Sequence, residues 1–427
     1  MAFFNEYILT RTWIPWRIRH QIDRWLYLKA VKNNPTFFRL ATLGRFKNII
    51  SRVTDGPKFH FFGYYEKTPW SNNEKYLLCH ETTFMDRPPS AGDPCVVGYI
   101  NLDNKKFHPI AETHAWSWQQ GAMLQWHPNS DTEKIIFNDR DENEFIAKVI
   151  NIQSGKTENY PMPFYAVSPK GTEALSLNFA RLQNLRPGYG YPGVEDRFKE
   201  EYYPENDGVY RIDLSSKEIR RIISINQLYR QNTLPEMKEV FHWVNHLQIN
   251  PSGTRALLLH RWQSKETVDG FKSRLYSFKL DGSELKCLLD SGTVSHYDWI
   301  DDERLVAWAH HPSSGNSFYK INAKNGSLSP IGEGVLSSDG HCSISPDREW
   351  ILTDTYPDSN QIRNLLIYNL ISQKKVDLEK FYSPTPDLLE IRCDLHPRWN
   401  RSGDKICVDS IHEGTRQMYI IDIKNLR

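Results

Sequence analysis

The amino-acid sequence predicts an all-β fold, a seven-bladed β-propeller that follows a short helical N-terminal extension. Three observations predict it. After residue 57, short β-prone apolar runs separated by turns replace helical spacing. A strand–turn–strand unit then recurs seven times, mostly about 45–55 residues apart, and a third strand follows most copies. A repeat of this length with about four strands is typical of a propeller blade.

Each copy has an apolar strand, a turn of the S-P-D-G type and a second apolar strand. The copies are TPWSNNEKYLLCHE (68–81), MLQWHPNSDTEKIIFND (123–139), YAVSPKGTEALSLNF (165–179), LQINPSGTRALLLHRW (247–262), YDWIDDERLVAWAHH (297–311), CSISPDREWILTDTY (342–356) and LHPRWNRSGDKICVDS (395–410). The last copy ends after its third strand, and an open sheet edge invites aggregation. We therefore expect the β-prone segment 48–53 to supply the outer strand of the seventh blade. The predicted propeller spans residues 48–427.

Residues 1–47 form a predicted helical extension with a basic character. Residues 1–56 carry ten Lys or Arg residues and three acidic ones, and apolar residues recur every three to four positions in 17–28 and 35–46. A basic, aromatic-rich segment is typical of peripheral contact with a membrane or an anionic partner. The alternative is a helical cap packed on the propeller.

The bulk composition excludes some classes of partner and location. The net charge is +1, which argues against nucleic acid as a partner. The first 30 residues have no long apolar core followed by a small-residue cleavage site, and the six Cys form no CxxC motif. These features favour a cytoplasmic protein, with the inner face of the membrane as a second expectation because of the basic segment. The oligomeric state is not predicted.

Four histidines stand at the same position in four successive repeats, and they predict a metal or catalytic centre. They are His246, His296, His341 and His396, and each is followed three residues later by an apolar residue. Side chains in phase in a repeat are in phase in space, so four imidazoles should converge on the propeller axis. Imidazole suits a divalent metal ion such as Zn or Mn, and Ca is a further candidate.

Two aspartates accompany these histidines. Asp339 and Asp394 each precede a histidine by two residues, and alternation along a strand puts residues two apart on one face. Each is therefore a candidate ligand or a partner of a ligand, and Asp339 is included in the predicted metal site.

Further polar residues gather on the same predicted face of the ring. The second strands of several blades end in polar groups, and a long insertion, 181–204, enters this face with RPGYGYPGVEDR inside it. Long loops on a rigid scaffold often carry binding groups. The residues expected to bind substrate are Gln119, Gln120, Asn138, Arg140, Asn178, Arg181 and Arg186.

The segments HFFGYYEKTPW (60–70), WSWQQGAMLQW (116–126) and NFARLQNLRPGYGY (178–191) carry a family resemblance. With the repeats, they resemble TolB-type propellers and, more specifically, the seven-bladed polysaccharide lyases: the oligogalacturonate and ulvan lyases. The related propeller α-L-rhamnosidases look like a further relative. The likeness covers roughly residues 57–427.

The resemblance implies a lyase that cleaves a uronic-acid-containing oligo- or polysaccharide by β-elimination. It implies a metal held by channel histidines, of which His296 and His341 match best, while Asp339 stands where oligogalacturonate lyases have another His. It also implies a His/Tyr acid–base set with an Arg that neutralises the substrate carboxylate. The matching catalytic candidates are His80, His260, Tyr189, Tyr191 and Arg197.

Two alternatives to the lyase remain. The first is a glycoside hydrolase: the resemblance to the rhamnosidases implies that His60 of HFFGYY is the catalytic residue and that the reaction is hydrolysis. The other is a propeller that binds glycan or protein without catalysis, since fold alone does not define function. A serine peptidase is disfavoured because the sequence has no G-x-S-x-G motif.

Overall fold

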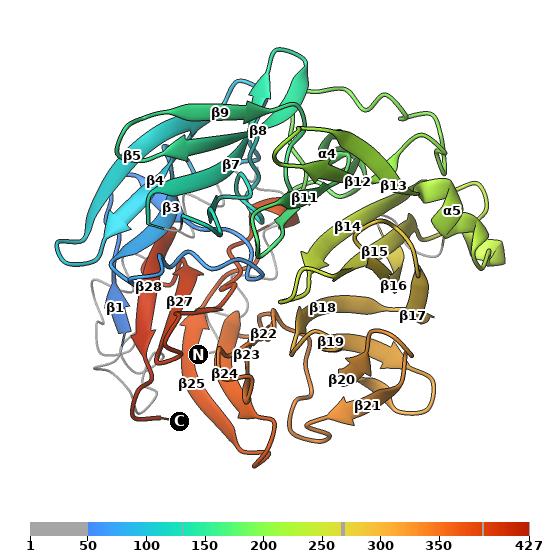
Figure 1. Ribbon diagram of the computed structural model, residues 1–427. Coiled ribbons are helices and arrows are strands. Elements are labelled where there is room, and N and C mark those ends of the chain that lie inside the picture. Colours follow the sequence, from blue (N-terminus) through green and yellow to red (C-terminus); the bar gives the residue numbers. More distant parts are fainter. Residues whose placement is uncertain (1–49, 131, 266–269, 387, 427) are drawn as a thin grey trace, which may run out of the picture.

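The predicted seven-bladed β-propeller is confirmed. The computed structural model describes residues 50–130, 132–265, 270–386 and 388–426. Its strands form seven four-stranded antiparallel sheets, which Figure 1 shows arranged as a ring. The predicted helical extension 1–47, with its membrane contact, lies outside the described residues.

The first three blades are built from strands that follow one another in the chain. Blade 1 contains β2 (Phe59–Phe61), β3 (Tyr76–Thr82), β4 (Cys95–Asn101) and β5 (Lys106–Thr113). Blade 2 contains β6 (Gln125–Trp126), β7 (Lys134–Asp141), β8 (Glu144–Asn151) and β9 (Thr157–Tyr160). Blade 3 contains β10 (Ala166–Val167), β11 (Glu173–Ser176), β12 (Gly208–Asp213) and β13 (Ile219–Ser224).

The next three blades follow the same order. Blade 4 contains β14 (His242–Ile249), β15 (Arg255–Gln263), β16 (Phe271–Lys279) and β17 (Lys286–Gly292). Blade 5 contains β18 (Val294–Trp299), β19 (Arg304–His311), β20 (Gly315–Asn322) and β21 (Leu328–Ile331). Blade 6 contains β22 (Ser343–Ile344), β23 (Trp350–Asp354), β24 (Ile362–Asn369) and β25 (Lys375–Tyr382).

Blade 7 joins the two ends of the described chain. It contains β26 (Arg398–Trp399), β27 (Lys405–Ser410), β28 (Gln417–Asp422) and the outer strand β1 (Ile50–Arg52). In the β1–β28 pairing, Ile50 lies opposite Ile421 and Arg52 opposite Tyr419. The outer strand therefore falls inside the segment 48–53. This pairing covers the edge that β28 would otherwise expose.

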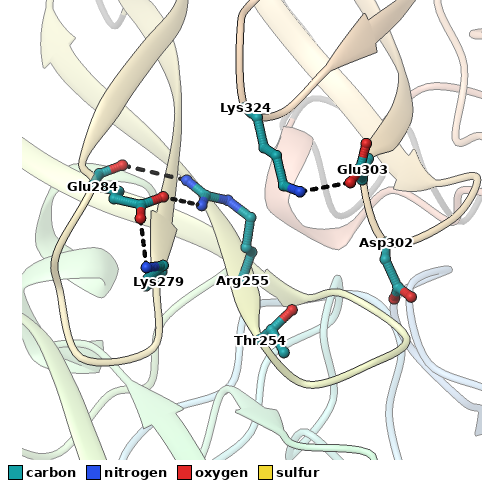
Figure 2. A pocket seen from close by; sticks show the side chains of 7 residues that line it. All are labelled: Thr254, Arg255, Lys279, Glu284, Asp302, Glu303 and Lys324. Carbon is teal, nitrogen blue, oxygen red and sulfur yellow. Dashed lines mark hydrogen bonds and ion pairs between the residues drawn. The ribbon is translucent and has the colours of Figure 1, made fainter.

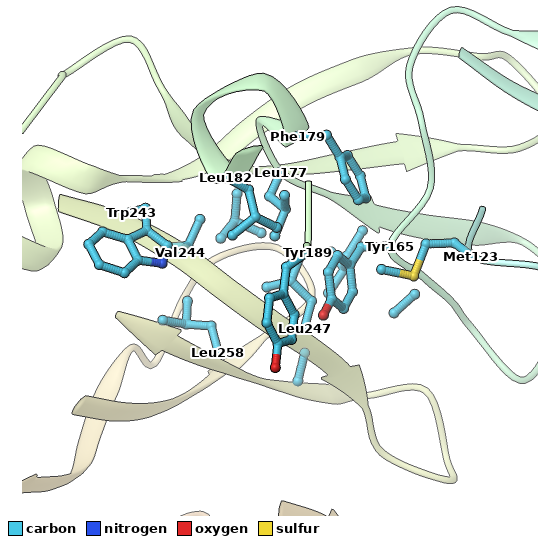
Figure 3. Packing of buried hydrophobic residues seen from close by; sticks show 14 of the residues in the cluster. Met123, Tyr165, Leu177, Phe179, Leu182, Tyr189, Trp243, Val244, Leu247 and Leu258 are labelled. Atoms are coloured by element: carbon cyan, nitrogen blue, oxygen red, sulfur yellow. The ribbon is translucent and has the colours of Figure 1, made fainter. Parts of the chain in front are cut away.

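The hydrophobic core lies between neighbouring blades. Alternate residues of a strand face opposite sides of its sheet, so each blade packs against both neighbours. Figure 3 shows one such layer, in which Trp243, Val244 and Leu258 of blade 4 meet Leu177 and Leu182 beside blade 3. Similar apolar layers fill the gaps between blades 4 and 5 and between blades 6 and 7.

Short helices occur in the connections. Within the described residues, α4 (Phe179–Leu185) lies in the insertion of blade 3, and α5 (Ile225–Arg230) with the 3₁₀ turn η1 (Pro235–Met237) links blades 3 and 4. A second 3₁₀ turn, η2 (Leu389–Ile391), precedes blade 7. Neither α-helix is long and apolar enough to span a bilayer.

Candidate functional site

The backbone turns sharply at the in-phase position of several blades. His246 and His396 have φ angles of 53° and 43°, in the left-handed region that residues other than Gly rarely adopt. Met123, the equivalent residue of blade 2, has a φ of 53°. In blade 4 the β14–β15 register shifts between Asn245 and Gln248, around His246. Such irregularities re-aim a side chain, here toward the axis.

The structure brings the four in-phase histidines together. The ring centroids of His296 and His341 are 4.2 Å apart, and those of His341 and His396 are 4.4 Å apart. Tyr64 connects the fourth, because its ring stacks on His246 at 4.8 Å and lies 5.0 Å from His396. We call these four histidines with Tyr64 the histidine cluster. All four histidines are at least 96% buried.

Within the histidine cluster, His341 and His396 join Asp394 in a group that could hold a metal ion. One ligand atom from each of the three lies within 4.8 Å of the others. Among the described residues, Nε2 of His341 and Nε2 of His396 have no hydrogen-bond partner. Nδ1 of His341 contacts Asp354 at 2.9 Å, which fixes the proton on Nδ1 and leaves Nε2 with a free lone pair. This is the usual arrangement of a metal-ligating histidine.

His246 and Asp339, both predicted metal ligands, do not belong to this three-residue group. Each ring nitrogen of His246 is bonded to a phenol, Nε2 to Tyr64 at 3.2 Å and Nδ1 to Tyr165 at 3.1 Å. Asp339 instead contacts Nδ1 of His296 at 2.9 Å. His296 lies beside the group without joining it, with its ring tilted by 50° to that of His341. Asp394 takes the position that the sequence assigned to Asp339.

Asp394 is held by two arginines. Its carboxylate pairs with Arg363 at 2.5 Å and with Nε of Arg392 at 2.6 Å. Burial favours the protonated acid, but Arg363 and Arg392 outweigh it and hold the pKa of Asp394 well below its usual range. Burial first, and then His341, lowers the pKa of His396. An ionised carboxylate beside a neutral imidazole is the protonation pattern that a metal ligand set requires.

Tyr189 carries a perturbed phenol next to this group. The Arg392 guanidinium donates to its hydroxyl at 2.9 Å. Burial raises the pKa of Tyr189, but Arg392 and Arg186 outweigh it, so the net pKa lies below the ordinary tyrosine value. Tyr189 also packs edge-on against His246, with centroids 5.7 Å apart. A buried phenol with a lowered pKa is suited to proton transfer.

Two arginines near Tyr189 have no acidic partner among the described residues. Arg186 and Arg261 share the ring of Phe271, at 4.7 and 4.6 Å, and Arg186 also covers Tyr189 at 5.1 Å. Their Nε atoms have no hydrogen-bond partner in the part of the chain that the structure describes. Burial, followed by the charge of Arg186, lowers the pKa of Arg261. Two neighbouring cations without a counter-charge favour an anionic ligand.

Three other catalytic candidates, His80, His260 and Tyr191, are held by contacts inside the fold. His80 accepts a hydrogen bond from the Ala122 N–H at 3.0 Å, and burial lowers its pKa to about 3. His260 bonds to His242 at 2.9 Å. Tyr191 stacks flat on Phe179 at 4.4 Å, and burial raises its pKa. The structure gives His80, His260 and Tyr191 no place in the histidine cluster.

Arg197 and His60 also lie in other environments. Arg197 is largely exposed and pairs with Glu144 at the start of β8. It is therefore already neutralised at the surface. His60 is buried, with Nδ1 on Gln417 at 3.1 Å and Nε2 on Glu81 at 3.2 Å. Both of its ring nitrogens are thus occupied where blade 1 meets blade 7.

The predicted substrate-binding residues serve mainly to hold loops. Gln119 donates to the carbonyls of Glu390 and Arg392, and Gln120 donates to the Tyr165 hydroxyl. Both side chains therefore hold segments that lie next to the histidine cluster. In the same motif, a Cβ on Gly121 (φ 58°) would lie 2.3 Å from the His80 ring, which explains the glycine.

The remaining five candidates differ in the contacts they make. Asn138 bonds to the Phe164 backbone, and Arg140 donates to the Ala91 carbonyl. Asn178 caps α4, and Arg181 is buried and anchors the insertion through Asp196 and several carbonyls. Arg186 alone among the seven substrate-binding candidates faces Tyr189 without an acidic partner.

Several members of the site were missed as candidates in the sequence. They are Tyr64, Asp354, Arg261, Arg363 and Arg392. Asp394 was a candidate ligand in the sequence but was not included in the predicted metal site. Closeness in the sequence was the usable signal for Arg392 and Asp394, since they precede His396 by four and two residues in the connection between η2 and β26. No local signal marks Arg363, whose contact with Asp394 depends on how β24 packs.

A surface cavity of about 460 Å³ lies at the opposite ends of the strands, between blades 4 and 5. It is lined by Thr254, Arg255, Lys279, Glu284, Asp302, Glu303 and Lys324. Figure 2 shows that its cations are paired: Arg255 and Lys279 pair with Glu284, and Lys324 pairs with Glu303. Asp302 accepts a hydrogen bond from the Ser252 N–H. With its cations paired, this cavity is a weaker candidate than the histidine cluster.

Comparison with solved structures places this fold beside propeller lyases. The oligogalacturonate lyase from Vibrio parahaemolyticus is 14% identical, with a TM-score of 0.63 over 89% of this chain and 95% of that one. An oligogalacturonate lyase in complex with manganese is 13% identical, with a TM-score of 0.65 over the same shares. The propeller domain of the Trilobed protease from Pyrococcus furiosus is 10% identical, with a TM-score of 0.51 over 86% of this chain and 96% of that one.

These likenesses show the fold alone. The predicted resemblance to propeller lyases is confirmed at that level, while a protease propeller shares the same architecture. No family model matches the sequence, and no curated protein matches it.

Proposed function

We propose that this protein is a metal-assisted lyase that cleaves a uronic-acid-containing glycan by β-elimination. The observation that carries the proposal is the convergence of two free imidazole Nε2 atoms with Asp394, beside two arginines that lack a counter-charge. The fold shared with oligogalacturonate lyases, one of which is in complex with manganese, supports it.

The residues present fit a divalent metal ion. His341, His396 and Asp394 would hold it, and Asp354 would orient His341. When bound, such an ion supplies a positive charge that polarises the carboxylate of the substrate. Two imidazoles and one carboxylate suit a transition ion such as manganese or zinc.

Arg186 and Arg261 provide a second source of positive charge. β-Elimination requires the proton on C5 of the uronate to leave, and a carboxylate paired with cations makes that proton more acidic. Because both guanidiniums are available, they replace Arg197 as the groups that we expect to bind the carboxylate.

Tyr189 is the proposed proton-transfer residue. Its phenolate takes the C5 proton, the electron pair forms the C4–C5 double bond, and the C4–O bond breaks. The departing oxygen then takes a proton, from the Tyr189 phenol or from water. The lowered pKa of Tyr189 favours the first step at neutral pH.

Ultraviolet absorbance of the unsaturated product tests the proposal. The protein is incubated with oligogalacturonates and other uronate oligosaccharides, with manganese, zinc or a chelator. We expect absorbance to rise with metal and to be abolished by chelation. Tyr189→Phe should lower the rate about 100-fold or more with little change in metal content. His310→Ala is the matched control, because His310 lies at the exposed end of blade 5, bonded to Asn316.

Absence of new absorbance across the panel with metal supplied would reject the lyase. Reducing sugars released without a double bond would indicate hydrolysis instead. Binding without any product would favour a glycan-binding propeller.

A further inference from the structure

A second cluster of unsatisfied polar groups lies in blade 4, away from the histidine cluster. Arg274 on β16 is completely buried, and none of its three guanidinium nitrogens has a hydrogen-bond partner among the described residues. Burying an unpaired charge is strongly unfavourable, so a folded protein normally supplies a counter-ion.

The neighbours of Arg274 share its lack of partners. His260 lies directly opposite Arg274 in the β15–β16 pairing, and Trp262 and Tyr276 are two residues away on the same face. The Arg274 guanidinium lies 5.3 Å from the Trp262 ring, and the His260 ring is 5.6 Å from Trp262 and 6.3 Å from Tyr276. Within the described chain, Nε1 of Trp262 and Nδ1 of His260 are buried and unbonded. The buried hydroxyl of Tyr276 lies beside the Arg274 guanidinium and the Cys287 thiol without a hydrogen bond of good geometry.

A chain of hydrogen bonds defines which of these atoms accept. The carbonyl of Met237 can only accept, so Nε2 of His242 donates to it at 2.8 Å. Nδ1 of His242 must then accept from Nε2 of His260, at 2.9 Å. The proton on Nε2 of His260 is thereby fixed, and burial, followed by His242 and Arg274, holds the pKa of His260 well below its usual range, so Nδ1 keeps its lone pair. The group therefore offers one cation, an indole donor, a phenol and a single acceptor.

We propose that Arg274, Trp262, Tyr276 and His260 enclose a small oxyanion that carries one hydroxyl group, of the bicarbonate or hydrogen phosphate type. The guanidinium pairs with two of its oxygens, and the indole and phenol donate to the one oxygen that remains in bicarbonate or the two that remain in hydrogen phosphate. The hydroxyl of the anion donates to Nδ1 of His260. A halide would satisfy the donors and leave that acceptor unpaired.

The site lies under the connection between blades 3 and 4. Trp262 packs against Met237 and Val240 of this connection. The carbonyl of His242 accepts from Arg181 at 2.6 Å, and Arg181 anchors the insertion that carries Tyr189. The bound anion therefore joins β15 to β16 beneath this connection, and it does so whether or not the protein is a lyase.

Thermal unfolding at constant ionic strength tests the site. We expect 100 mM phosphate or bicarbonate to raise the Tm of the wild-type protein by about 2–5 °C over the same ionic strength of chloride. Arg274→Met should lose this increment, and Trp262→Phe should weaken the apparent affinity about 3–10-fold by removing one donor.

Arg255→Met is the matched control, because Arg255 is a buried arginine of the same blade that pairs with Glu284. It should lower the Tm but keep the phosphate increment. A crystal soaked in arsenate should show anomalous density beside Arg274, which tests the site even if Arg274→Met fails to fold. Chloride as effective as phosphate would overturn the hydroxyl assignment. No anomalous peak, or an equal increment in Arg274→Met, would overturn the site.

Discussion

The backbone of blades 2 and 7 bends in the same way, but the side chain at the bend has a different role in each blade. Met123 and His396 occupy equivalent positions, both with left-handed backbone, and both are buried. Two residues later, blade 2 has Gln125 and blade 7 has Arg398. Met123 lies in a hydrophobic layer, whereas His396 joins the histidine cluster. The bend is therefore a property of the propeller, and the side chain alone makes one blade structural and the other a candidate site.

Replacing the two in-phase residues should give the largest contrast. His396→Ala should lower metal affinity and lyase rate more than about 100-fold, because loss of a ligand should exceed the loss of an outer contact. Met123→Ala should lower the free energy of unfolding by about 2–5 kcal/mol and leave metal binding unchanged. Metal analysis and chemical denaturation measure the two effects. Equal metal loss in both variants would contradict the division between the blades.

The position two residues after the in-phase residue should give the next largest effect, which is a change in the free energy of unfolding. Arg398 is buried and pairs with Asp409 at 2.9 Å, and Asp409 also accepts from the Phe62 and Gly63 N–H groups. Arg398→Met leaves the buried Asp409 without its cation, so the free energy of unfolding should fall by about 3–5 kcal/mol. Urea unfolding of the variant checks this. A loss below about 1 kcal/mol would show that the backbone donors suffice for Asp409.

In blade 5 the residue two positions after His296 is an acid, Asp298. This predicts that the stability of the protein depends on pH. Asp298 is half-buried, and desolvation raises its pKa to about 6 despite hydrogen bonds from Gln248 and the Ile344 N–H. The folded state then binds the proton more tightly than the unfolded state, so this group loses stability as pH rises from about 4 to about 6. Relative to wild type, Asp298→Asn should gain at most about 3 kcal/mol across that window. Parallel stability curves from pH 4 to 7 would contradict the raised pKa.

An exposed ion pair should have the smallest effect. Lys199 and Glu195 pair at 2.5 Å on the surface of the insertion, where water screens the charges. Lys199→Ala should leave the free energy of unfolding unchanged within the error of the measurement. Denaturation beside Arg398→Met compares an exposed pair with a buried one. A loss as large as that of Arg398→Met would show that the insertion depends on this pair.

The propeller could be predicted because its signal is local and repeated. The turn chemistry of 250–253 and 345–348 and the apolar strands around it recur in every blade, and each copy reinforces the others. The convergence of His246, His296, His341 and His396 followed from the same repeat.

The assignment of roles within the cluster could not be predicted in the same way. His246 has both nitrogens bonded to tyrosines that come from other blades, and nothing near it in the sequence indicates this. Likewise, Arg197 belongs to a promising loop motif but pairs with Glu144 across the surface.

Repetition along the chain was thus enough to establish the ring and to bring the in-phase residues to its axis, because a repeated local pattern produces a repeated geometry. Which polar atoms remain free there depends on partners from other strands, as with Asp354 at the end of β23 beside His341 and Arg363 on β24 beside Asp394. A hydrogen bond is made or lost over a few tenths of an ångström, and only the packed fold sets distances at that scale.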